Sequence, residues 1–297
     1  MKGGARMNTA GIDVGGTQLR AAVFDESNRM IASQKVENDR ALSGAENLNR
    51  LIGFLRECGP LSGVGVGCPG PLDLRRGRVL NPPNLVGWDN FEIVAFLEER
   101  LGVRAVLNND ANVAGLAEAL LGAGKGCESV AFVGVSTGIG GAFVHRGRLY
   151  CGANGNAAEF WNMIVNDDRY CHRSANPGSL NEQCSGSGLA RIATERYGRR
   201  MDARELFERS REGDPTAREI VIRQVDTLAR GIANITCTLD PEVIVIGGSV
   251  ALHNPEYVEL ARRRALEYVN YPDALDVRPA KFGDDAGLIG AALLARS

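Results

Sequence analysis

The residues of this chain best suited to chemistry on a phosphate lie in two glycine-rich strings. The first is Asp13-Val-Gly15-Gly16-Thr17, and Ser136-Thr137-Gly138-Ile-Gly140-Gly141 repeats its character later in the chain. Glycines allow positive φ and let backbone N–H groups approach an anion without a Cβ in the way, and threonine adds a hydroxyl. One such string also fits a tight β-hairpin with no ligand, but the pair favours a phosphate site.

Asp110 is a second carboxylate in a position suited to chemistry. It lies in Asn108-Asn109-Asp110-Ala-Asn112, after a strand predicted at residues 104–108 and before a helix predicted at residues 111–121. A carboxylate there caps the helix by accepting from its free N–H groups, or acts as a base that orients a hydroxyl for phosphoryl transfer. The two roles are compatible, so position alone leaves the choice open.

A third apolar strand also ends in glycines, in Val243-Ile-Val-Ile-Gly247-Gly248-Ser249. Its backbone offers an edge against which a flat adenine could lie, although a buried strand with a small-residue turn has the same pattern. Three glycine-capped strands in this order are typical of the actin-like ATPase superfamily.

The elements that must position these residues fall into two similar halves. Apolar runs predict three antiparallel strands at residues 9–15, 18–25 and 29–36, and a helix, strand, helix and strand at 44–58, 61–67, 91–102 and 104–108. Residues 128–152 repeat the opening three strands. We therefore predict an α/β fold in which a βββαβα unit is duplicated. Beyond an irregular stretch at 152–186, we expect a long helix at 215–239, a strand at 241–250 and two closing helices.

Length and composition bound the remaining possibilities. A chain of 297 residues suggests two lobes with a central cleft, which we place at 1–117 plus about 283–297 and at 118–282. A formal charge of −2 argues against a nucleic-acid partner, and no N-terminal apolar stretch suggests a membrane anchor. Seven cysteines without a CxxC pair indicate a reducing, cytoplasmic location.

Six strings together carry a family resemblance that covers almost the whole chain: IDVGGTQLRAAVFD, GVGCPGPLD, NPPNLVGW, LNNDANVAGLAE, STGIGGAFVHRG and VIVIGGSV. They resemble the ROK family of sugar kinases and related repressors. The resemblance implies a kinase that uses ATP and Mg²⁺ to phosphorylate a hexose or N-acetylhexosamine, at the 6-hydroxyl, with Asp110 as the base. It further implies that Gly15, Gly16, Thr17, Thr137 and Gly138 grip the ATP phosphates, that Gly247 and Gly248 face the adenosine, and that Asp13 reaches Mg²⁺ through water. Otherwise Asp13 is a turn aspartate that caps its own loop.

The same resemblance assigns the sugar contacts to Asn84, Asn109, Asp110 and Glu159, and by alignment to Asn162 and Asn181. Asparagine offers a donor and an acceptor, which suits vicinal hydroxyls. Without the resemblance, Asn84 is an ordinary loop residue after two prolines. Because Asn162 and Asn181 stand where the family has histidine and glutamate, glucose specificity is not assumed.

Many ROK proteins also bind zinc through that histidine and three cysteines. Alignment on Asn176-Pro177-Gly178 places His172, Ser174 and Ser179 at the three cysteine positions, which leaves one plausible ligand. A structural zinc site needs four, so we expect none. The spacing of Cys171, His172 and Cys184 matches no standard metal site, and whether they bind a metal stays open. Packing of Phe160, Trp161 and Met163 is one replacement for the metal, and an ordinary core role is the other interpretation.

Two other functions remain for comparison. A sugar-responsive regulator would carry a helix-turn-helix domain, whereas only about ten residues precede the first predicted strand. A non-catalytic sugar-binding protein would not need Asp110. Family members form dimers or tetramers, so we expect a homo-oligomer of unspecified size, and polyphosphate is an alternative donor to ATP.

Overall fold

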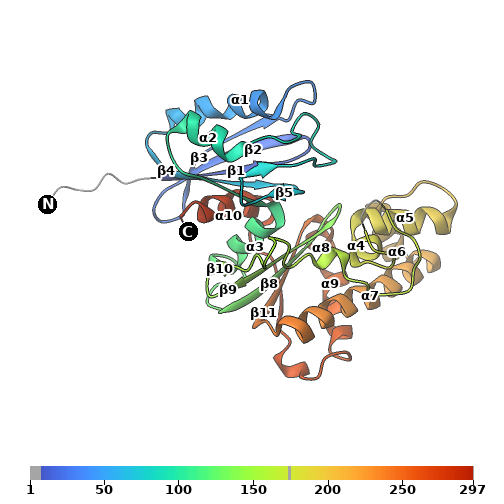
Figure 1. Ribbon diagram of the computed structural model, residues 1–297. Helices are drawn as coiled ribbons and strands as arrows, with labels where there is room; N and C mark the ends of the chain where they lie inside the picture. The colour runs from blue at the N-terminus through green and yellow to red at the C-terminus, as the bar shows by residue number, and fades with distance from the viewer. Residues whose placement is uncertain (1–7, 173–174, 297) are drawn as a thin grey trace. The chain divides into compact units, whose positions relative to one another are not determined.

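The computed structural model describes residues 8–172 and 175–296, which form two compact units (Figure 1). The first unit runs up to Ala117 and also takes in the chain from Asp284 onward, and the second is Glu118–Gly283. Each unit is built on a five-stranded sheet, in the order β3-β2-β1-β4-β7 in the first and β10-β9-β8-β11-β12 in the second. The two orders correspond strand for strand, which confirms the predicted duplication.

The sheet of the first unit begins with three antiparallel strands, β1 (Asn8–Val14), β2 (Gln18–Phe24) and β3 (Met30–Glu37). Strands β4 (Leu61–Cys68) and β7 (Ala105–Asn109) continue it in parallel with β1. The inner strands β1 and β4 are almost continuously buried, as expected for strands covered on both faces. The sequence did not predict the two-residue strands β5 (Leu72–Asp73) and β6 (Arg78–Val79), which pair with each other.

Three helices cover the two faces of this sheet. Figure 1 shows α1 (Gly44–Glu57) and α2 (Ile93–Leu101) on one face and α10 (Ala286–Leu294) on the other. Ser43 and Glu46 form a reciprocal capping box that begins α1. The fourth helix, α3 (Asp110–Leu120), follows β7 directly.

Helix α10 packs directly on the backbone of the strands. A Cβ built on Gly65 would stand 1.8 Å from the Ala291 carbonyl oxygen, and one built on Gly11 would stand 2.1 Å from that of Leu288. Gly290 approaches Val113 of α3 as closely, since its Cβ would lie 1.7 Å from the Val113 oxygen. Only glycine at these positions lets α10 reach β1, β4 and α3 at once.

The second sheet repeats the arrangement. Strands β8 (Ser129–Val135), β9 (Ile139–His145) and β10 (Arg148–Leu149) are antiparallel, and β11 (Val243–Gly247) and β12 (Val277–Pro279) extend it in parallel. Strand β12 corrects the sequence analysis, which ended the chain with two helices after β11. Its three residues show no periodicity, and only pairing with β11 makes them a strand.

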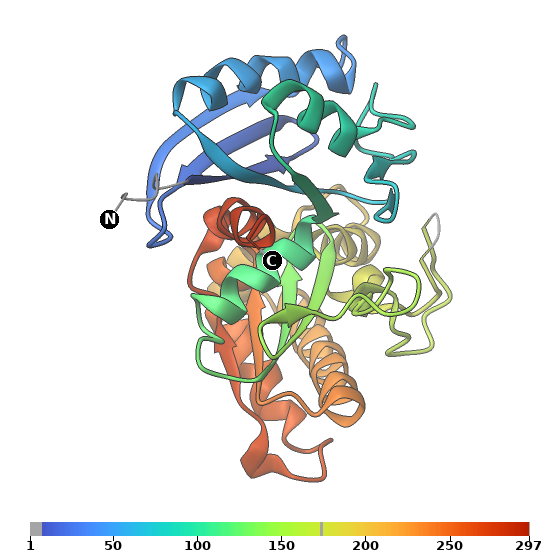
Figure 2. The ribbon, with the colours of Figure 1, turned by 60° about the vertical axis from the view of Figure 1, so that its left-hand side comes forward.

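The helices of the second unit are α4 (Leu180–Cys184), α5 (Gly186–Tyr197), α6 (Ala203–Glu212), α7 (Pro215–Leu239), α8 (Ser249–His253) and α9 (Pro255–Ala265), with short 3₁₀ turns η1 (Phe160–Asn162), η2 (Pro272–Ala274) and η3 (Gly283–Asp285). Helix α7 has the predicted bounds: Asp214 caps its first turn, and Asp240 ends it in the left-handed conformation at φ 44°. Figure 2 shows α7 and α9 side by side. Among the described residues, no helix has the length and apolar character needed to cross a membrane.

Candidate functional site

The carboxylates singled out in the sequence follow neighbouring parallel strands of the first sheet. Asp13 on β1 is paired in register with Gly67 on β4, and Cys68 at the end of β4 is paired with Asn109 at the end of β7. Asp110 is the next residue after β7. Ligands of open α/β sheets bind beyond the carboxyl ends of the strands, which is the edge where Asp13 and Asp110 lie.

Cys68 lies at the end of β4, between the strands that carry Asp13 and Asn109. Its side chain is fully buried, and its Sγ donates to the Pro69 carbonyl oxygen at 3.6 Å. Burial raises the pKa of the Cys68 thiol, and the negative charges of Asp110 and Asp13 raise it further. This direction agrees with the sheet order, in which β4 lies between β1 and β7.

The first glycine loop, residues 15–17, is held by backbone and asparagine hydrogen bonds. The Gly15 N–H donates to the Gln18 oxygen at 2.9 Å. Asn38 binds both sides of the loop: its Nδ2 donates to the Gly15 oxygen at 2.8 Å and its N–H donates to the Thr17 oxygen at 2.9 Å. The sequence analysis did not identify Asn38, which is 4% exposed. It leaves Thr17 exposed at the tip of the loop.

Asn84 lies against this loop. A Cβ built on Gly16 would stand 3.1 Å from the Asn84 carbonyl oxygen and 3.8 Å from its Cβ, so Gly16 leaves room for the contact. Leu85 and Trp88 anchor the Asn84 segment in the core with exposures of 1% and 0%, while Asn84 itself is exposed. The indole N–H of Trp88 donates to Asn38 Oδ1 at 3.2 Å. Residues predicted for the phosphate and for the sugar thus lie together in the first unit.

Asp13 is paired with an arginine that the sequence analysis did not identify. Arg20 donates from Nη2 and from Nε to Oδ2 of Asp13, and Nη2 also donates to the Asp284 carbonyl oxygen. The other oxygen of Asp13 faces the first turn of α10, where a Cβ on Gly287 would stand 3.2 Å from Oδ1. Arg20 is opposite Asp13 in the β1–β2 register. The hairpin predicted around Gly15 and Gly16 was the signal that could have revealed this pair.

The Asn109-Asp110 pair begins α3. The N–H of Ala111 is shared between Oδ1 of Asn109 at 3.0 Å and Oδ1 of Asp110 at 2.8 Å. The bond from Ala111 to Asn109 spans two residues and is the one that caps the helix. Asp110 is half-buried at the sheet edge. Asn109 therefore shares the capping of α3, which the sequence analysis considered as a role for Asp110.

The second glycine loop, residues 136–138, is held by the starts of two helices. The N–H groups of Gly186 and Ser187, at the start of α5, donate to the carbonyl oxygens of Ser136 at 2.8 Å and Thr137 at 3.1 Å. Ser249, the first residue of α8, lies 2.9 Å from Ser136 between the two Oγ atoms. These contacts fix the turn between β8 and β9, in which Thr137 and Gly138 lie.

Gly248 is required where β11 meets α8. Its φ is +87°, and a Cβ there would stand 2.4 Å from the Val135 carbonyl oxygen at the end of β8. Gly247 pairs with Gly134 in the parallel β8–β11 register. The predicted adenosine-facing glycines, Gly247 and Gly248, are thus next to the second glycine loop.

Asn181 also contacts the second glycine loop and the first residue of β9. Its Oδ1 accepts from the Ile139 N–H at 2.9 Å, and its Nδ2 donates to Oε1 of Glu182 at 3.0 Å. A Cβ on Gly138 would stand 3.3 Å from the same Oδ1. The amide that the sequence analysis assigned to the sugar therefore supports the start of β9.

Glu159 and Asn162 lie around η1 of the same unit. Glu159 is exposed, and its Oε2 accepts from the Trp161 indole N–H. Asn162 Oδ1 accepts from the Asn176 N–H at 2.6 Å, and Asn176 Nδ2 donates to the Asn162 oxygen at 3.1 Å. A Cβ on Gly141 would stand 2.3 Å from the Ala158 carbonyl oxygen, so η1 is held close to β9.

The segment after η1 is held by polar side chains. Gln183, 2% exposed, accepts from Asn166 Nδ2 at 2.9 Å and donates to Asp168 Oδ2 at 2.8 Å. Arg191 also donates to Asp168 Oδ2, at 3.1 Å, and its guanidinium lies 4.0 Å from the Tyr170 ring centroid. This network joins the segment after η1 to α4 and α5.

The cysteines near this segment differ in their exposure to solvent. Cys184 is fully buried and donates to the Gln224 oxygen of α7 at 3.7 Å, whereas Cys171 and His172 are exposed. Ser174, aligned with a zinc cysteine, lies outside the described residues. Within residues 8–172 and 175–296, no group of three or more His, Cys, Asp or Glu side chains is arranged to hold a metal.

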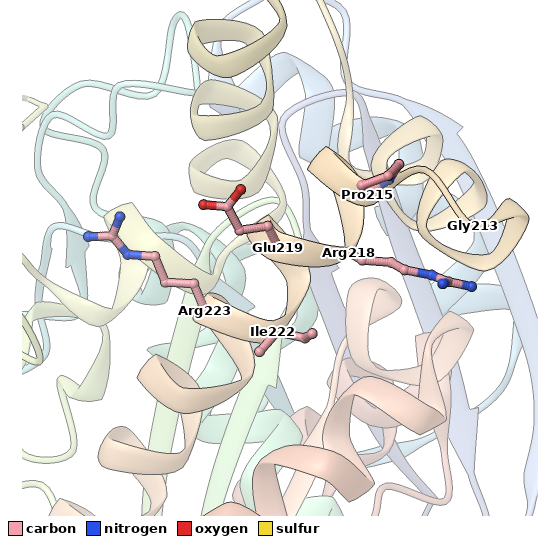
Figure 3. Close-up of a pocket in the computed structure, with 6 residues that line it drawn as sticks. All are labelled: Gly213, Pro215, Arg218, Glu219, Ile222 and Arg223. Carbon is pink, nitrogen blue, oxygen red and sulfur yellow. The ribbon is translucent and has the colours of Figure 1, made fainter.

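A surface hollow at the start of α7 is separate from these residues. It is lined by Gly213, Pro215, Arg218, Glu219, Ile222 and Arg223, and the arginine side chains in Figure 3 extend in opposite directions. None of the predicted site residues lines it.

Comparison with known proteins agrees with this architecture. The duplicated sheets define the actin-like ATPase fold. The family model described as "ROK family" matches residues 9–297, and the chain belongs to that family.

Three similar proteins illustrate the range of the family. The ROK hexokinase of Thermus thermophilus is 36% identical, with a TM-score of 0.92 and coverage of 98% of both chains. The ROK family glucokinase of Streptomyces griseus, solved in complex with glucose and AMPPNP, is 28% identical with a TM-score of 0.80 over 97% of this chain and 99% of that one. The N-acetylmannosamine kinase of Salmonella heidelberg is 34% identical over 98% of this chain and 99% of its own length.

Proposed function

We propose that this protein is a sugar kinase that transfers the terminal phosphate of ATP to the 6-hydroxyl of a hexose or N-acetylhexosamine. One observation carries the proposal: the strand register brings Asp110 to the same sheet edge as Asp13 and the first glycine loop. A carboxylate beside a phosphate-binding loop is what in-line phosphoryl transfer needs. Relatives named as kinases of glucose and of N-acetylmannosamine support the substrate class.

Asp110 is the proposed general base. It orients the attacking hydroxyl and accepts its proton as the bond to phosphorus forms. A carboxylate within hydrogen-bond reach of the hydroxyl suffices for this role, and it is compatible with the bond from the Ala111 N–H to Asp110 Oδ1. Asn84, Asn109 and Glu159 are the proposed direct contacts of the sugar.

Asn162 and Asn181 have a different part in this proposal. Their side-chain oxygens bind Asn176 and Ile139. We propose that Asn162 influences the choice of sugar by fixing the segment after η1, and that Asn181 acts through the start of β9 and the second glycine loop beside it.

The nucleotide and its magnesium fit the residues present. Gly15, Gly16, Thr17, Thr137 and Gly138 are the proposed phosphate contacts, through the threonine hydroxyls and through backbone N–H groups other than that of Gly15, which donates to Gln18. Gly247 and Gly248 are proposed to face the adenosine. Arg20 binds Oδ2 of Asp13, so we assign the water of Mg²⁺ to Oδ1, the oxygen that faces the first turn of α10. When bound, Mg²⁺ neutralises charge on the transferred phosphate.

A coupled assay of ADP release tests the proposal. The purified chain is incubated with ATP, with and without Mg²⁺, and with glucose, mannose, N-acetylglucosamine or N-acetylmannosamine; a parallel series replaces ATP by polyphosphate. We expect Mg²⁺-dependent turnover with at least one sugar and ATP. Sugar binding by calorimetry with no turnover on any sugar would instead support a non-catalytic binding protein.

We further propose that the chain works in the cytoplasm as a homo-oligomer. Kinship with a family of sugar kinases supports this proposal. Light scattering on the eluting protein gives its mass directly, and a mass of one chain at working concentration would contradict it.

A further inference from the structure

Glu118 is a fully buried carboxylate that the proposed chemistry does not use. It is 0% exposed, and it accepts three backbone hydrogen bonds. Oε1 accepts from the N–H groups of Lys281 at 2.9 Å and Phe282 at 2.8 Å, and Oε2 accepts from that of Ala123 at 3.0 Å. Burying a carboxylate is costly unless hydrogen bonds replace its water, and three N–H donors do so here.

The partners of Glu118 have a special place in the chain. Helix α3 carries the chain out of the first unit, and Glu118 is the first residue of the second. Lys281 and Phe282 come just before Gly283, where the chain leaves the second unit again. One side chain thus joins, inside the second unit, the outgoing and the returning connection.

The surroundings of Glu118 leave its carboxylate little freedom. A Cβ built on Gly122 would stand 2.1 Å from Oε2. The Glu118 carbonyl oxygen accepts from the N–H groups of Gly122 at 3.1 Å and Gly124 at 2.9 Å, which closes the end of α3 around it. A carboxylate fixed in this way acts as a rigid clamp between two backbone segments.

The clamped helix is the one that begins with Asp110. The first half of α3 lies close to the first sheet and α10, because Gly67 and Gly290 leave room for Val113. Movement at the Glu118 end of so short a helix is transmitted to its other end, and small displacements of a reacting group reduce turnover steeply.

We propose that Glu118 is a positioning residue that locks α3 to the returning segment and thereby fixes Asp110. Its catalytic consequence rests on the proposed kinase function, whereas the clamp itself does not.

The test compares Glu118→Gln with the intact chain. Glutamine keeps the size and one acceptor oxygen, but its NH₂ group would face the N–H of Ala123 or those of Lys281 and Phe282. We expect amide hydrogen exchange to accelerate at least about tenfold in peptides covering residues 118–124 and 278–286. We also expect kcat to fall about 10- to 100-fold while the KM for ATP changes little.

Two further variants make the test decisive. Glu219→Gln changes an exposed glutamate of the same unit and should match the intact protein in both readouts. Gly122→Ala displaces the Glu118 carboxylate without removing it, and it decides the question by the same readouts where Glu118→Gln does not fold. Unchanged exchange overturns the clamp, and faster exchange with unchanged kcat overturns the positioning role. If the intact chain turns over no sugar, the kinase proposal fails while the exchange result still decides the clamp.

Discussion

Arg20 donates two hydrogen bonds to a single oxygen of Asp13, from Nη2 at 2.7 Å and from Nε at 3.1 Å. The pair joins facing positions of β1 and β2, and both side chains are largely shielded from water. A third bond from Arg20, to the Asp284 carbonyl oxygen, ties the pair to the segment that leads into α10. The orientation of Asp13 is therefore set by a neighbour on the next strand.

Replacing Arg20 by lysine should weaken the hydrogen bonds that orient the Asp13 carboxylate. A single ammonium cannot reproduce the two directed bonds to Oδ2 and the one to Asp284. We expect kcat/KM for ATP to fall about tenfold at saturating Mg²⁺, which corresponds to about 1.4 kcal/mol of transition-state stabilisation. Steady-state kinetics measure this, with Arg29→Lys on the exposed end of the adjacent hairpin as the control. An equal fall of kcat/KM in both variants would contradict a specific role of Arg20 in orienting Asp13.

Replacing Asp110 by asparagine should separate binding from turnover. The amide keeps the shape and an oxygen for the Ala111 N–H but cannot accept the proton of the sugar hydroxyl. We expect kcat to fall about 10²- to 10⁴-fold while the calorimetric Kd for the sugar changes only a few-fold. Asp25→Asn, in the turn between β2 and β3, is the control. Near-normal turnover in Asp110→Asn would exclude Asp110 as the base.

Replacing Asn181 by alanine should weaken nucleotide use more than sugar use. The Ile139 N–H at the start of β9 would lose its acceptor, and the second glycine loop beside it would lose a support. A lost hydrogen bond of this kind is worth about 1 kcal/mol, so the KM for ATP should rise about fivefold. Kinetics with each substrate varied in turn measure the effect, with exposed Asn270→Ala as the control. If only the KM of the sugar rises, Asn181 instead contacts the sugar directly.

Asp168 should make the network around Gln183 sensitive to acid. Burial raises the pKa of Asp168, but hydrogen bonds from the Tyr170 N–H, Gln183 and Arg191 outweigh it and leave the pKa below its ordinary value. A depressed folded-state pKa adds stability above the unfolded-state pKa, and this stability is lost as the pH falls through the folded value. We expect Asp168→Asn to be about 1 kcal/mol less stable at pH 7 and the difference to shrink below about pH 4.

Urea unfolding of both proteins between pH 3 and pH 7 measures this difference. Asp167→Asn changes the exposed neighbouring carboxylate and should leave the pH dependence as it is in the intact protein. A gap between Asp168→Asn and the intact chain that stays constant down to pH 3 would mean that ionisation of Asp168 contributes nothing.

The sequence predicted the elements that carry strong periodicity. The duplicated strands and α7 could be found because apolar spacing and cap residues such as Asp214 and Asp240 are local signals. Strand β12 could not, because three residues become a strand only by pairing with β11. Local signals thus determine where an element lies, and long-range pairing determines the last member of a sheet.

The same division applies to the candidate site. Asp13, Asp110 and the glycines were predicted from their strings, but Arg20 and Asn38 act through partners on other segments. Asn181 was assigned from an alignment, and only the structure reveals its bond to Ile139. A residue that positions another residue on a distant segment has no local sequence motif by which it could be recognised.

The contact of α10 with Gly11 and Gly65 has a consequence for how the chain is made. A ribosome completes residues 118–283 before it adds the residues of α10, so every part of the second unit is present while the first still lacks a helix. Strands β1 and β4 leave the exit tunnel early, and the face that α10 covers stays exposed until α10 is made. Emergence of α10, rather than of the N-terminal half alone, is the event that lets the first unit finish folding.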